Sequence, residues 1–370
     1  MSEEKRDYAL EQRGSETEIP APDYPYLPQE PRDYSPAIGL IGCGGITEYH
    51  LRAYKKAGYR VVALCNRTES KARDRQREFY PDADVFTDYR DLLKRDDIEV
   101  VDVATHPEER APIMEDAIEA GKHVLSQKPF VTDLDVGARL ADLGAQKGVK
   151  LAVNQNGRWA PHVSYIRHAI AAGQVGDVFA VHCSVHWNHD WIADNEFDAV
   201  TNMIFFDFGV HWFDGLDCLL PGQTPRRVYG SLARSPVQRA REPLLGQALI
   251  QYDNAQASLV FDGNVQLGTQ NRTFVAGTSG TLLSIGPSIT EQSVTLSTEE
   301  GIAKPDIEGS WFEEGFHGAM SELLCAIEED REPLHGARGN LAGLALCFAA
   351  IESARRGEPV EPGSVSRLPG

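Results

Sequence analysis

The chain has much less positive charge than negative charge, and this imbalance excludes two classes of partner. Its 36 lysine and arginine residues face 55 aspartate and glutamate residues, which gives a formal net charge of -19 at pH 7. So acidic a chain repels nucleic acid and anionic membrane surfaces. We also expect no secretory leader, because the start of the sequence lacks a basic segment followed by an apolar one. The sequence has no apolar run of about 18 residues, the length that a membrane-spanning helix needs. We therefore expect no nucleic-acid partner and no membrane association.

Closely spaced cysteines are also missing. Six cysteines stand singly along the chain, with neither a C-x-x-C pair nor the ligand spacing of a zinc site. Isolated thiols of this kind are typical of reduced, mostly buried side chains in a reducing compartment. We accordingly expect a cytoplasmic protein without a metal. The cysteines are Cys43, Cys65, Cys183, Cys218, Cys325 and Cys347.

Residues 1–36 differ in composition from the rest of the chain. They are charged at the start and then rich in proline and tyrosine, so they cannot build a core. Such a segment is typical of a disordered tail or an extended arm. Tyr24, Tyr26 and Tyr34 leave open an arm that packs on a neighbouring subunit.

From residue 37 onward, apolar runs alternate with amphipathic stretches. The 370 residues, 42% of them hydrophobic, are enough for two cores. The alternation up to residue 153 predicts a doubly wound parallel sheet with crossover helices, typical of a Rossmann domain over residues 37–153. The expected strands are 37–41, 61–65, 100–104, 123–126 and 149–153, and the clearest expected helices are 108–120 and 133–147.

The rhythm changes after residue 154. Several strands follow one another, separated by turn residues, which predicts an open and mostly antiparallel sheet. We expect residues 154–370 to form a second α/β domain, with its last helices able to pack back on the first. The expected strands are 178–187, 227–232, 248–252, 257–261, 272–276 and 281–285, and the expected helices are 161–172, 207–220, 316–329 and 340–355.

A glycine-rich loop carries the first indication of chemistry. Gly42-Cys-Gly44-Gly45-Ile46-Thr follows an apolar strand and opens a helix. Glycines at that point let backbone amides approach the pyrophosphate of a dinucleotide. The third glycine of the usual motif is replaced here by Thr47. A glycine-rich turn that binds nothing is the alternative, and the loop's position between strand and helix favours the cofactor.

The end of the second strand bears on which dinucleotide is bound. NAD enzymes usually place an acidic residue about 20 positions after the loop, where it holds the ribose diol. This chain has Asn66-Arg67-Thr68 instead. Because an arginine and small hydrogen-bond donors attract the extra phosphate of NADP, the sequence favours NADP over NAD. The alternative is that Arg67 stacks on adenine or is solvated, and that NAD binds.

Three titratable residues form the candidate catalytic set. Lys128 follows the expected strand 123–126, at the sheet edge where ligands bind in open α/β folds. Asp207 and His211 are four residues apart on an expected helix, which places them on one face. Lys128 is suited to polarise a reacting oxygen, His211 to accept a proton and Asp207 to support His211. Each residue also has a structural alternative: an exposed lysine, a helix cap and a core histidine.

Together these residues resemble the Gfo/Idh/MocA family, the glucose-fructose oxidoreductase and inositol dehydrogenase group. The resemblance covers residues 37 to about 220 and rests on several motifs together. It implies a Rossmann domain, a second domain whose open sheet forms subunit interfaces, and hydride exchange between a nicotinamide and a sugar or polyol carbon, catalysed by Lys128, Asp207 and His211. The motifs are Gly42 to Ile46 with His50, residues 120–124, Lys128-Pro129, Asn154 to Trp159 with Pro161, and Asp207 to His211.

The same resemblance suggests further ligand contacts, beyond the glycine loop and Asn66-Arg67-Thr68. The expected cofactor contacts are Thr105, His106, Gln127, Lys128 and Asn156. The expected substrate contacts are Lys128, Arg158, Trp159, His186, Trp187, Asp207 and His211.

Two positions depart from the family pattern. Gln127 stands where many relatives carry glutamate, which removes a negative neighbour from Lys128. Arg110 occupies a place where relatives often have histidine, and His106 lies four residues earlier. We expect the contacts around the nicotinamide to be rearranged accordingly.

A segment dense in histidine and tryptophan, residues 182–191, follows the strand that should border the substrate. Aromatic faces and hydrogen-bond donors suit a polyhydroxylated ring, which makes His186 and Trp187 candidates for substrate lining. His182 and His186 share one strand face but have no obvious carboxylate partner, so a metal site is not expected.

The resulting prediction is an NAD(P)-dependent dehydrogenase of a sugar, inositol or sugar acid, acting as a homodimer or homotetramer through the second sheet. Two alternatives remain. One is a redox-neutral relative, of oxidoreductase or glycosidase type, with tightly held cofactor. The other is a non-catalytic nucleotide or sugar sensor. The presence of Lys128, Asp207 and His211 together argues against the sensor.

Overall fold

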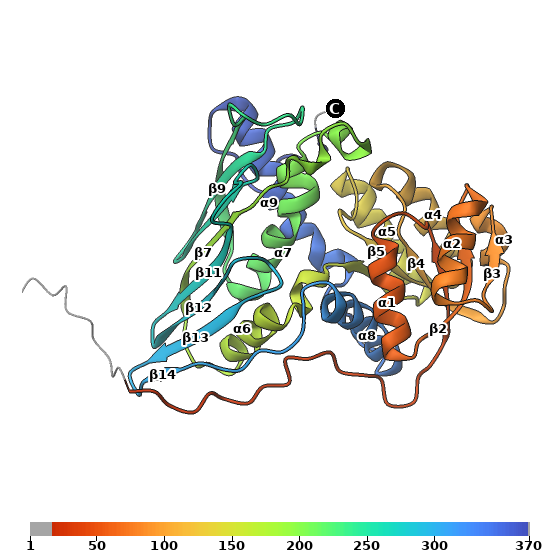
Figure 1. Cartoon of the computed structure of the whole chain (residues 1–370), viewed down its shortest axis with the longest axis horizontal. Coiled ribbons are helices and arrows are strands. Elements are labelled where there is room, and N and C mark those ends of the chain that lie inside the picture. Colours follow the sequence, from red (N-terminus) through yellow and green to blue (C-terminus); the bar gives the residue numbers. More distant parts are fainter. Residues whose placement is uncertain (1–16, 369–370) are drawn as a thin grey trace, which may run out of the picture.

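The chain forms two sheets with helices between them. The computed structural model describes residues 17–368. Figure 1 shows the six-stranded sheet and its helices on the right and the eight-stranded sheet on the left, with α7 and α9 between the two sheets. The predicted fold class, a Rossmann sheet followed by an α/β half with an open sheet, is confirmed. In the described part of the chain, no helix is both long and apolar enough to cross a membrane.

The first sheet is parallel throughout, with strand order β3-β2-β1-β4-β5-β6. Its strands are nearly all buried, as expected of a sheet covered on both faces by helices. Every expected strand is present to within about two residues. The three-residue β3 was missed because so short a segment has no readable period. The strands are β1 Ala37–Ile41, β2 Arg60–Cys65, β3 Asp84–Phe86, β4 Ile98–Val103, β5 His123–Gln127 and β6 Leu151–Asn154. The helices are α1 Thr47–Ala57, α2 Glu69–Phe79, α3 Tyr89–Leu93, α4 Pro107–Glu119 and α5 Leu134–Lys147.

The second sheet has the order β14-β13-β12-β11-β7-β10-β9-β8 and is antiparallel except where β10 pairs with β7. Two of its strands, β13 and β14, were missed because serine and threonine dominate the first and the second has two residues. The strands are β7 Val178–His186, β8 Pro225–Ala233, β9 Leu245–Tyr252, β10 Gln256–Asp262, β11 Gln270–Gly277, β12 Gly280–Gly286, β13 Ser293–Thr298 and β14 Ile302–Ala303.

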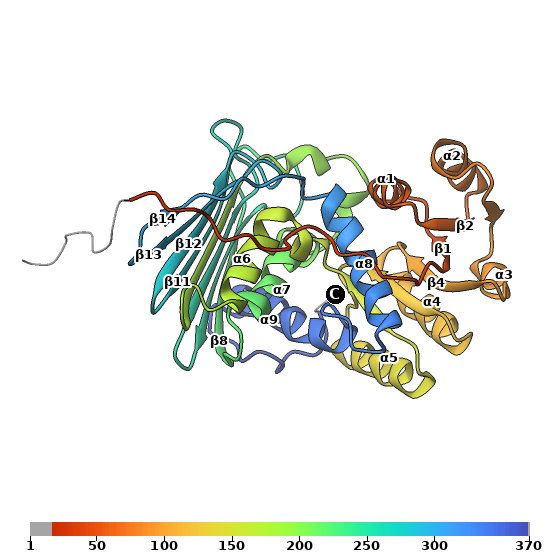
Figure 2. The same cartoon turned by 90° about the horizontal axis from the view of Figure 1, so that it is seen from below.

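The two faces of the second sheet differ in what covers them. Helices α6 (Pro161–Ala171), α7 (Val210–Leu219) and α9 (Ala337–Arg356) lie on the inner side, and Figures 1 and 2 show no described helix on the outer side. Because strand residues alternate between faces, every second side chain is buried and the others are exposed or half-buried. Tyr229 and Leu249, which lie opposite each other on β8 and β9, are large exposed apolar side chains of this kind.

The last two helices join the two halves. Helix α8 (Glu313–Glu328) packs on the Rossmann sheet through Phe316, Met320 and Leu323, which share a core with β1. Helix α9 follows α8 and contacts β8 of the second sheet and α5 of the first half. The expectation that the last helices reach back to the first domain therefore has a physical basis in the apolar face of α8.

The part of the N-terminal arm that the structure describes is extended and packs on its own chain. Figures 1 and 2 show it running from the edge of the second sheet, past α6 and α8, to β1. Ile19 pairs with Ile302, and Tyr24 and Tyr26 contact the Tyr165 ring. The Glu328 carboxylate accepts hydrogen bonds from three successive backbone amides at 32–34. Residues 17–36 are therefore extended, one of the two forms that the sequence left open, and Tyr24 and Tyr26 pack within the chain; residues 1–16 lie outside the described part.

Candidate active site

The glycine loop between β1 and α1 has the shape that a dinucleotide needs. Gly42 adopts a positive φ of 98°, and a Cβ there would lie 2.7 Å from the Ala104 carbonyl oxygen, so only glycine fits. A Cβ at Gly44 or Gly45 would meet nothing within 4 Å, which leaves space for a ligand beside the backbone. Thr47, in place of the third glycine, turns inward, and its hydroxyl donates to the Gly44 carbonyl at 2.7 Å. The substitution is therefore compatible with the loop.

A cleft of about 480 Å³ opens along this loop. The Asn66 side chain lies at its base and accepts a hydrogen bond from the Cys43 amide at 3.0 Å. Arg67 lies at the rim and forms an ion pair with Glu109 of α4 at 2.7 Å. The predicted cofactor residues that line the cleft are Gly42, Gly44, Asn66, Arg67, Thr68, Thr105 and His106. The chain thus has room and donors for a dinucleotide at the carboxyl edge of the parallel sheet.

Lys128 and Asp207 meet where the two halves of the chain face each other. The Lys128 Nζ atom lies 3.1 Å from Asp207 Oδ1 and donates to the Asp207 carbonyl oxygen at 2.8 Å. Asp207 lies in a short π-helix, Ile204–Gly209, that runs directly into α7. The wider π turn alters the spacing of an α-helix and is frequent at functional sites. In this structure, the Asp207 carboxylate pairs with Lys128, and the expectation that it supports His211 stays a prediction.

His211 lies on the first turn of α7, close to this pair. Burial, reinforced by the positive charge of Lys128, holds the pKa of His211 well below its usual range. Its imidazole is therefore neutral at physiological pH, as an acceptor of protons must be. The His211 Nδ1 atom is buried and has no hydrogen-bond partner among the described residues, so a polar group of a bound molecule could satisfy it.

The structure adds His189 to this group. The Trp187 indole donates to His189 Nδ1 at 3.0 Å, which leaves the other ring nitrogen as the donor of the neutral imidazole. Burial is the main reason that the pKa of His189 falls to about 4, and the charges of Asp207 and Lys128 act on it in opposite directions. Trp187 and His189 both contact the Phe208 ring, beside Asp207. The density of histidine and tryptophan was the only sequence signal for His189.

Three predicted ligand contacts have other buried roles. Arg158 forms a two-pronged ion pair with Asp214, at 2.6 and 2.8 Å, and donates its remaining nitrogen to the Leu334 carbonyl. Burial disfavours its charge, but Asp214 more than compensates and raises the pKa of Arg158. Trp159 packs against Gly318 of α8, and the Asn156 amide donates to the Trp311 carbonyl. In this structure, the contacts of these three residues are with neighbouring segments of the chain, and their predicted ligand contacts remain predictions.

His186 also lies elsewhere. On β7, Cys183 and Val185 are buried beneath the helices, so His186 points to the open side of the sheet by alternation. Its Nδ1 pairs with Asp262 on that side at 2.8 Å. The structure therefore does not bring His186 together with Lys128 and Asp207, whereas Trp187, one residue later, contacts Phe208 beside Asp207.

Gln127 and two loop residues lie next to the cleft instead of lining it. The Gln127 amide group bridges a ring nitrogen of His50 at 2.9 Å and the Lys128 backbone amide at 2.6 Å. His50 in turn pairs with the buried carboxylate of Asp102 at 2.7 Å. Gly45 and Ile46 are not among the residues that line the cleft. Gln127 therefore supports the backbone of Lys128 from within the protein.

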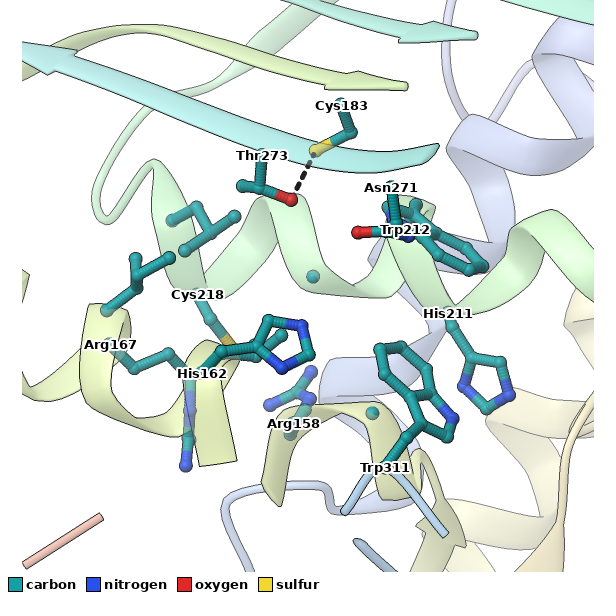
Figure 3. Close-up of a pocket in the computed structure, with 15 residues that line it drawn as sticks. Arg158, His162, Arg167, Cys183, His211, Trp212, Cys218, Asn271, Thr273 and Trp311 are labelled. Carbon is teal, nitrogen blue, oxygen red and sulfur yellow. Dashed lines mark hydrogen bonds between the residues drawn. The ribbon is translucent and has the colours of Figure 1, made fainter. Parts of the chain in front are cut away.

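A small internal cavity lies on the sheet side of α7, as Figure 3 shows. His162 points into it, and Trp311 stands between His162 and His211. The volume of about 30 Å³ is room for a water molecule and too little for a sugar ring. Substrate is therefore expected on the other side of His211, where Lys128 and Asp207 lie.

Comparison with known sequences identifies relatives for both halves. A family model described as "Oxidoreductase family, NAD-binding Rossmann fold" matches residues 37–155, and one described as "GFO/IDH/MocA C-terminal domain" matches residues 163–283. D-apiose dehydrogenase of Paraburkholderia graminis is 26% identical over 87% of this chain and 88% of its own length. Inositol 2-dehydrogenase of Burkholderia multivorans is 31% identical, over only 50% of this chain and 54% of the relative.

Solved structures agree with the fold. An oxidoreductase from Agrobacterium radiobacter, in complex with NAD+, L-tartaric acid and magnesium, has a TM-score of 0.80 at 20% identity and matches 90% of this chain and 99% of its own. Levoglucosan dehydrogenase in complex with NADH has a TM-score of 0.76 at 19% identity and matches 90% of this chain and all of its own, 100%. At these identities the likeness shows the fold alone.

The buried histidines make stability depend on pH. Burial lowers the pKa of His162 and His335 to about 3 and that of His189 to about 4, and His211 is lowered in the same way. All four are neutral when folded, whereas the unfolded chain binds protons on them below about pH 6.5. Stability should therefore fall as the pH drops from about 6.5 to 4, by up to about 1.4 kcal/mol per pH unit for each histidine.

Urea unfolding at a series of pH values checks this expectation. His335→Gln removes one of the four groups without touching Lys128 or Asp207, so the pH slope should shrink by about one proton. A slope that is the same in His335→Gln as in the wild type would contradict the assignment of His335 as a neutral buried group.

Proposed function

Because the chain belongs to the Gfo/Idh/MocA oxidoreductase family, we propose that it is an NAD(P)-dependent dehydrogenase acting on a CH–OH group of a sugar, an inositol or a sugar acid. The observation that carries this proposal is the meeting of Lys128, Asp207 and a neutral His211 at the carboxyl edge of the dinucleotide-binding sheet. The names of the relatives support a small polyhydroxylated substrate.

Each member of the trio has a distinct role in the proposed reaction. A bound nicotinamide supplies the acceptor for hydride. Lys128, which is 16% exposed, donates a hydrogen bond to the substrate oxygen and favours its alkoxide character. Asp207 balances the positive charge of Lys128 and fixes the position of the Nζ atom. His211 is neutral and accepts the hydroxyl proton.

Aromatic and imidazole groups complete the proposed substrate site. Trp187 and Phe208 stack with their ring centroids 4.0 Å apart, and His189 contacts both. Such surfaces suit the apolar faces of a sugar ring, and the free ring nitrogen of His189 suits a hydroxyl group. We assign substrate binding to Lys128, Trp187, His189, Asp207 and His211.

We further propose that the cofactor is NADP. Lys71 and Arg90 line the same cleft as Asn66, Arg67 and Thr68. Cations near the end of β2 attract the 2′-phosphate of NADP. Residues 66–68, which directly follow β2, include no carboxylate that could hold a ribose diol. Solved relatives bind NAD+ or NADH, which makes the choice of dinucleotide a property to be measured on this chain.

We also propose that the protein is a homodimer or homotetramer of the cytoplasm. The open side of the second sheet carries Tyr229 and Leu249, which are 41% and 57% exposed and lie opposite each other on β8 and β9. Clustered apolar side chains on a face that the described chain leaves bare are typical of a protein interface. All six cysteines are free thiols, which suits a reducing compartment.

The catalytic roles predict large losses of turnover. A panel of aldoses, inositols and sugar acids, assayed with NADP and NAD by the absorbance of the reduced nicotinamide, should identify a substrate. With that substrate, Lys128→Met and His211→Ala should each reduce kcat by about 10²- to 10⁴-fold, because each removes a group that acts on the moving proton or the reacting oxygen. His186→Ala, on the far face of the sheet, is the control and should retain kcat.

Two outcomes would count against this proposal. Retained activity in His211→Ala would exclude His211 as the proton acceptor. Cofactor that stays bound through purification, with substrate converted and no net nicotinamide signal, would favour a redox-neutral reaction over a dehydrogenase.

The cofactor proposal predicts a selective loss of affinity. Arg67→Ala should raise the Kd for NADPH about 10- to 100-fold, because this is the effect of losing one charge-assisted hydrogen bond. The Kd for NADH should be almost unchanged. Titration of nucleotide fluorescence measures both values. Arg77→Ala on α2, paired with Asp74 outside the cleft, is the matched control. An equal loss for both nucleotides in Arg67→Ala would show that Arg67 does not read the phosphate.

The interface proposal predicts that one charge on the open sheet separates the subunits. Leu249→Arg places a cation among apolar side chains and should reduce the molar mass in solution to that of a monomer. Size-exclusion chromatography with light scattering measures the mass. Leu267→Arg changes an 89% exposed leucine in the turn between β10 and β11 and should leave the mass unchanged. A wild-type monomer would refute the interface.

A further inference from the structure

Arg110, on the first turn of α4, is a fully buried arginine that binds only backbone. Its side chain is 1% exposed. The Nε atom donates to the Thr105 carbonyl at 3.2 Å, and a terminal nitrogen donates to the same oxygen. The other terminal nitrogen donates to the carbonyl oxygens of Gln127 and Pro129. These two carbonyls belong to the residues immediately before and after Lys128.

The charge of Arg110 is not neutralised by direct pairing. None of the ion pairs formed by residues 17–368 includes Arg110, whereas the other fully buried arginine, Arg158, has Asp214 against it. Burial lowers the pKa of Arg110 to about 9, with the charges of Asp207 and Asp102 acting against that fall. The guanidinium therefore stays charged at neutral pH, at a considerable cost of desolvation.

The three acceptors connect the two working parts of the site. Thr105 lines the cofactor cleft, at the end of β4. Gln127 and Pro129 hold the ends of the segment from which Lys128 reaches Asp207. One rigid, planar guanidinium thus fixes the distance between the rim of the nucleotide cleft and the backbone of the lysine.

We propose that Arg110 is a positioning residue: it anchors the backbone on both sides of Lys128 to the Thr105 carbonyl, so that the Lys128 ammonium is held against Asp207 and the reacting oxygen. The effect on turnover rests on the proposed function, because Lys128 is a catalytic residue only if that function is correct. The effect on the position of Lys128 does not.

Lys122, directly before strand β5, provides a matched control. It is 8% exposed, and its Nζ atom donates to the carbonyl oxygens of Arg95 and Ile98, both at 2.8 Å. Both residues are buried cations that donate to backbone carbonyls. Lys122 lies just before β5 begins, whereas Arg110 holds the backbone where β5 ends. If Arg110 served stability alone, replacing either cation would have the same kind of effect.

The first measurement is steady-state turnover of Arg110→Met, Arg110→Lys and Lys122→Met. In Arg110→Met, kcat should fall about 10²-fold with KM almost unchanged, because displacement of a catalytic group by about 1 Å has an effect of this size. Arg110→Lys keeps the charge and part of the hydrogen bonding and should recover part of kcat. Lys122→Met should lower the melting temperature and keep kcat. All rates are compared where near-ultraviolet circular dichroism shows the variants folded.

The second measurement needs no substrate. An amine-reactive acylating reagent is applied to the whole protein, and mass spectrometry follows the modification rate of the peptide that contains Lys128. In Arg110→Met the rate should rise several-fold, because the lysine is released from Asp207; in Lys122→Met it should equal that of the wild type. If Arg110→Met does not fold, Arg110→Lys is compared with the wild type in both measurements.

The outcomes separate the two proposals. Faster labelling of Lys128 together with a lower kcat supports the positioning role. Unchanged labelling in a folded Arg110 variant overturns it, whatever happens to kcat. If no sugar, inositol or sugar acid is oxidised by the wild type, the proposed function fails, and the labelling rate alone still decides the role of Arg110.

Discussion

The contact between Lys128 and Asp207 is the interaction on which the arrangement of the site depends. Lys128 directly follows the last residue of β5 in the first sheet. Asp207 lies in the π-helix just before α7, which packs on the second sheet. The pair therefore exists only if both sheets and the helices between them are held in register. Both side chains are partly buried, so the attraction between the Lys128 ammonium and the Asp207 carboxylate is stronger than at a free surface. The free-energy cost of leaving either charge without its partner is larger for the same reason.

Buried polar contacts behind the pair supply that rigidity. On one side, Arg158 and Asn340 both donate to Asp214, which ties the segment after β6 and helix α9 to α7. On the other side, Asp102 and His50 hold Gln127 next to the Lys128 backbone. Hydrogen bonds in such buried networks cost free energy when they are only partly satisfied, so each network favours one arrangement of its side chains.

The parts of the fold that the sequence predicted well are those with local causes. The glycine loop, the apolar strands and the helix that begins after Pro107 follow from residue type and period over a few positions. Contacts between distant segments have no such signal. Arg158 and Trp159 matched a family motif, but only the structure reveals Asp214 and Gly318 as their partners. The face to which His186 points depends on which side of β7 the helices cover. The π turn at Asp207 changes the spacing between Asp207 and His211 from that of a continuous α-helix.

Charge balance bears on the roles proposed for these groups. The half-buried imidazole of His211 beside a cation is held neutral, which is the form that can accept a proton at neutral pH. The same cation is matched by the carboxylate of Asp207, so that the pair carries no net charge into the partly dry site. If Asp207 instead contacted His211, it would favour the imidazolium and leave Lys128 unbalanced. In the proposed reaction, the observed pairing would leave His211 to take the proton and Lys128 to stabilise the oxygen.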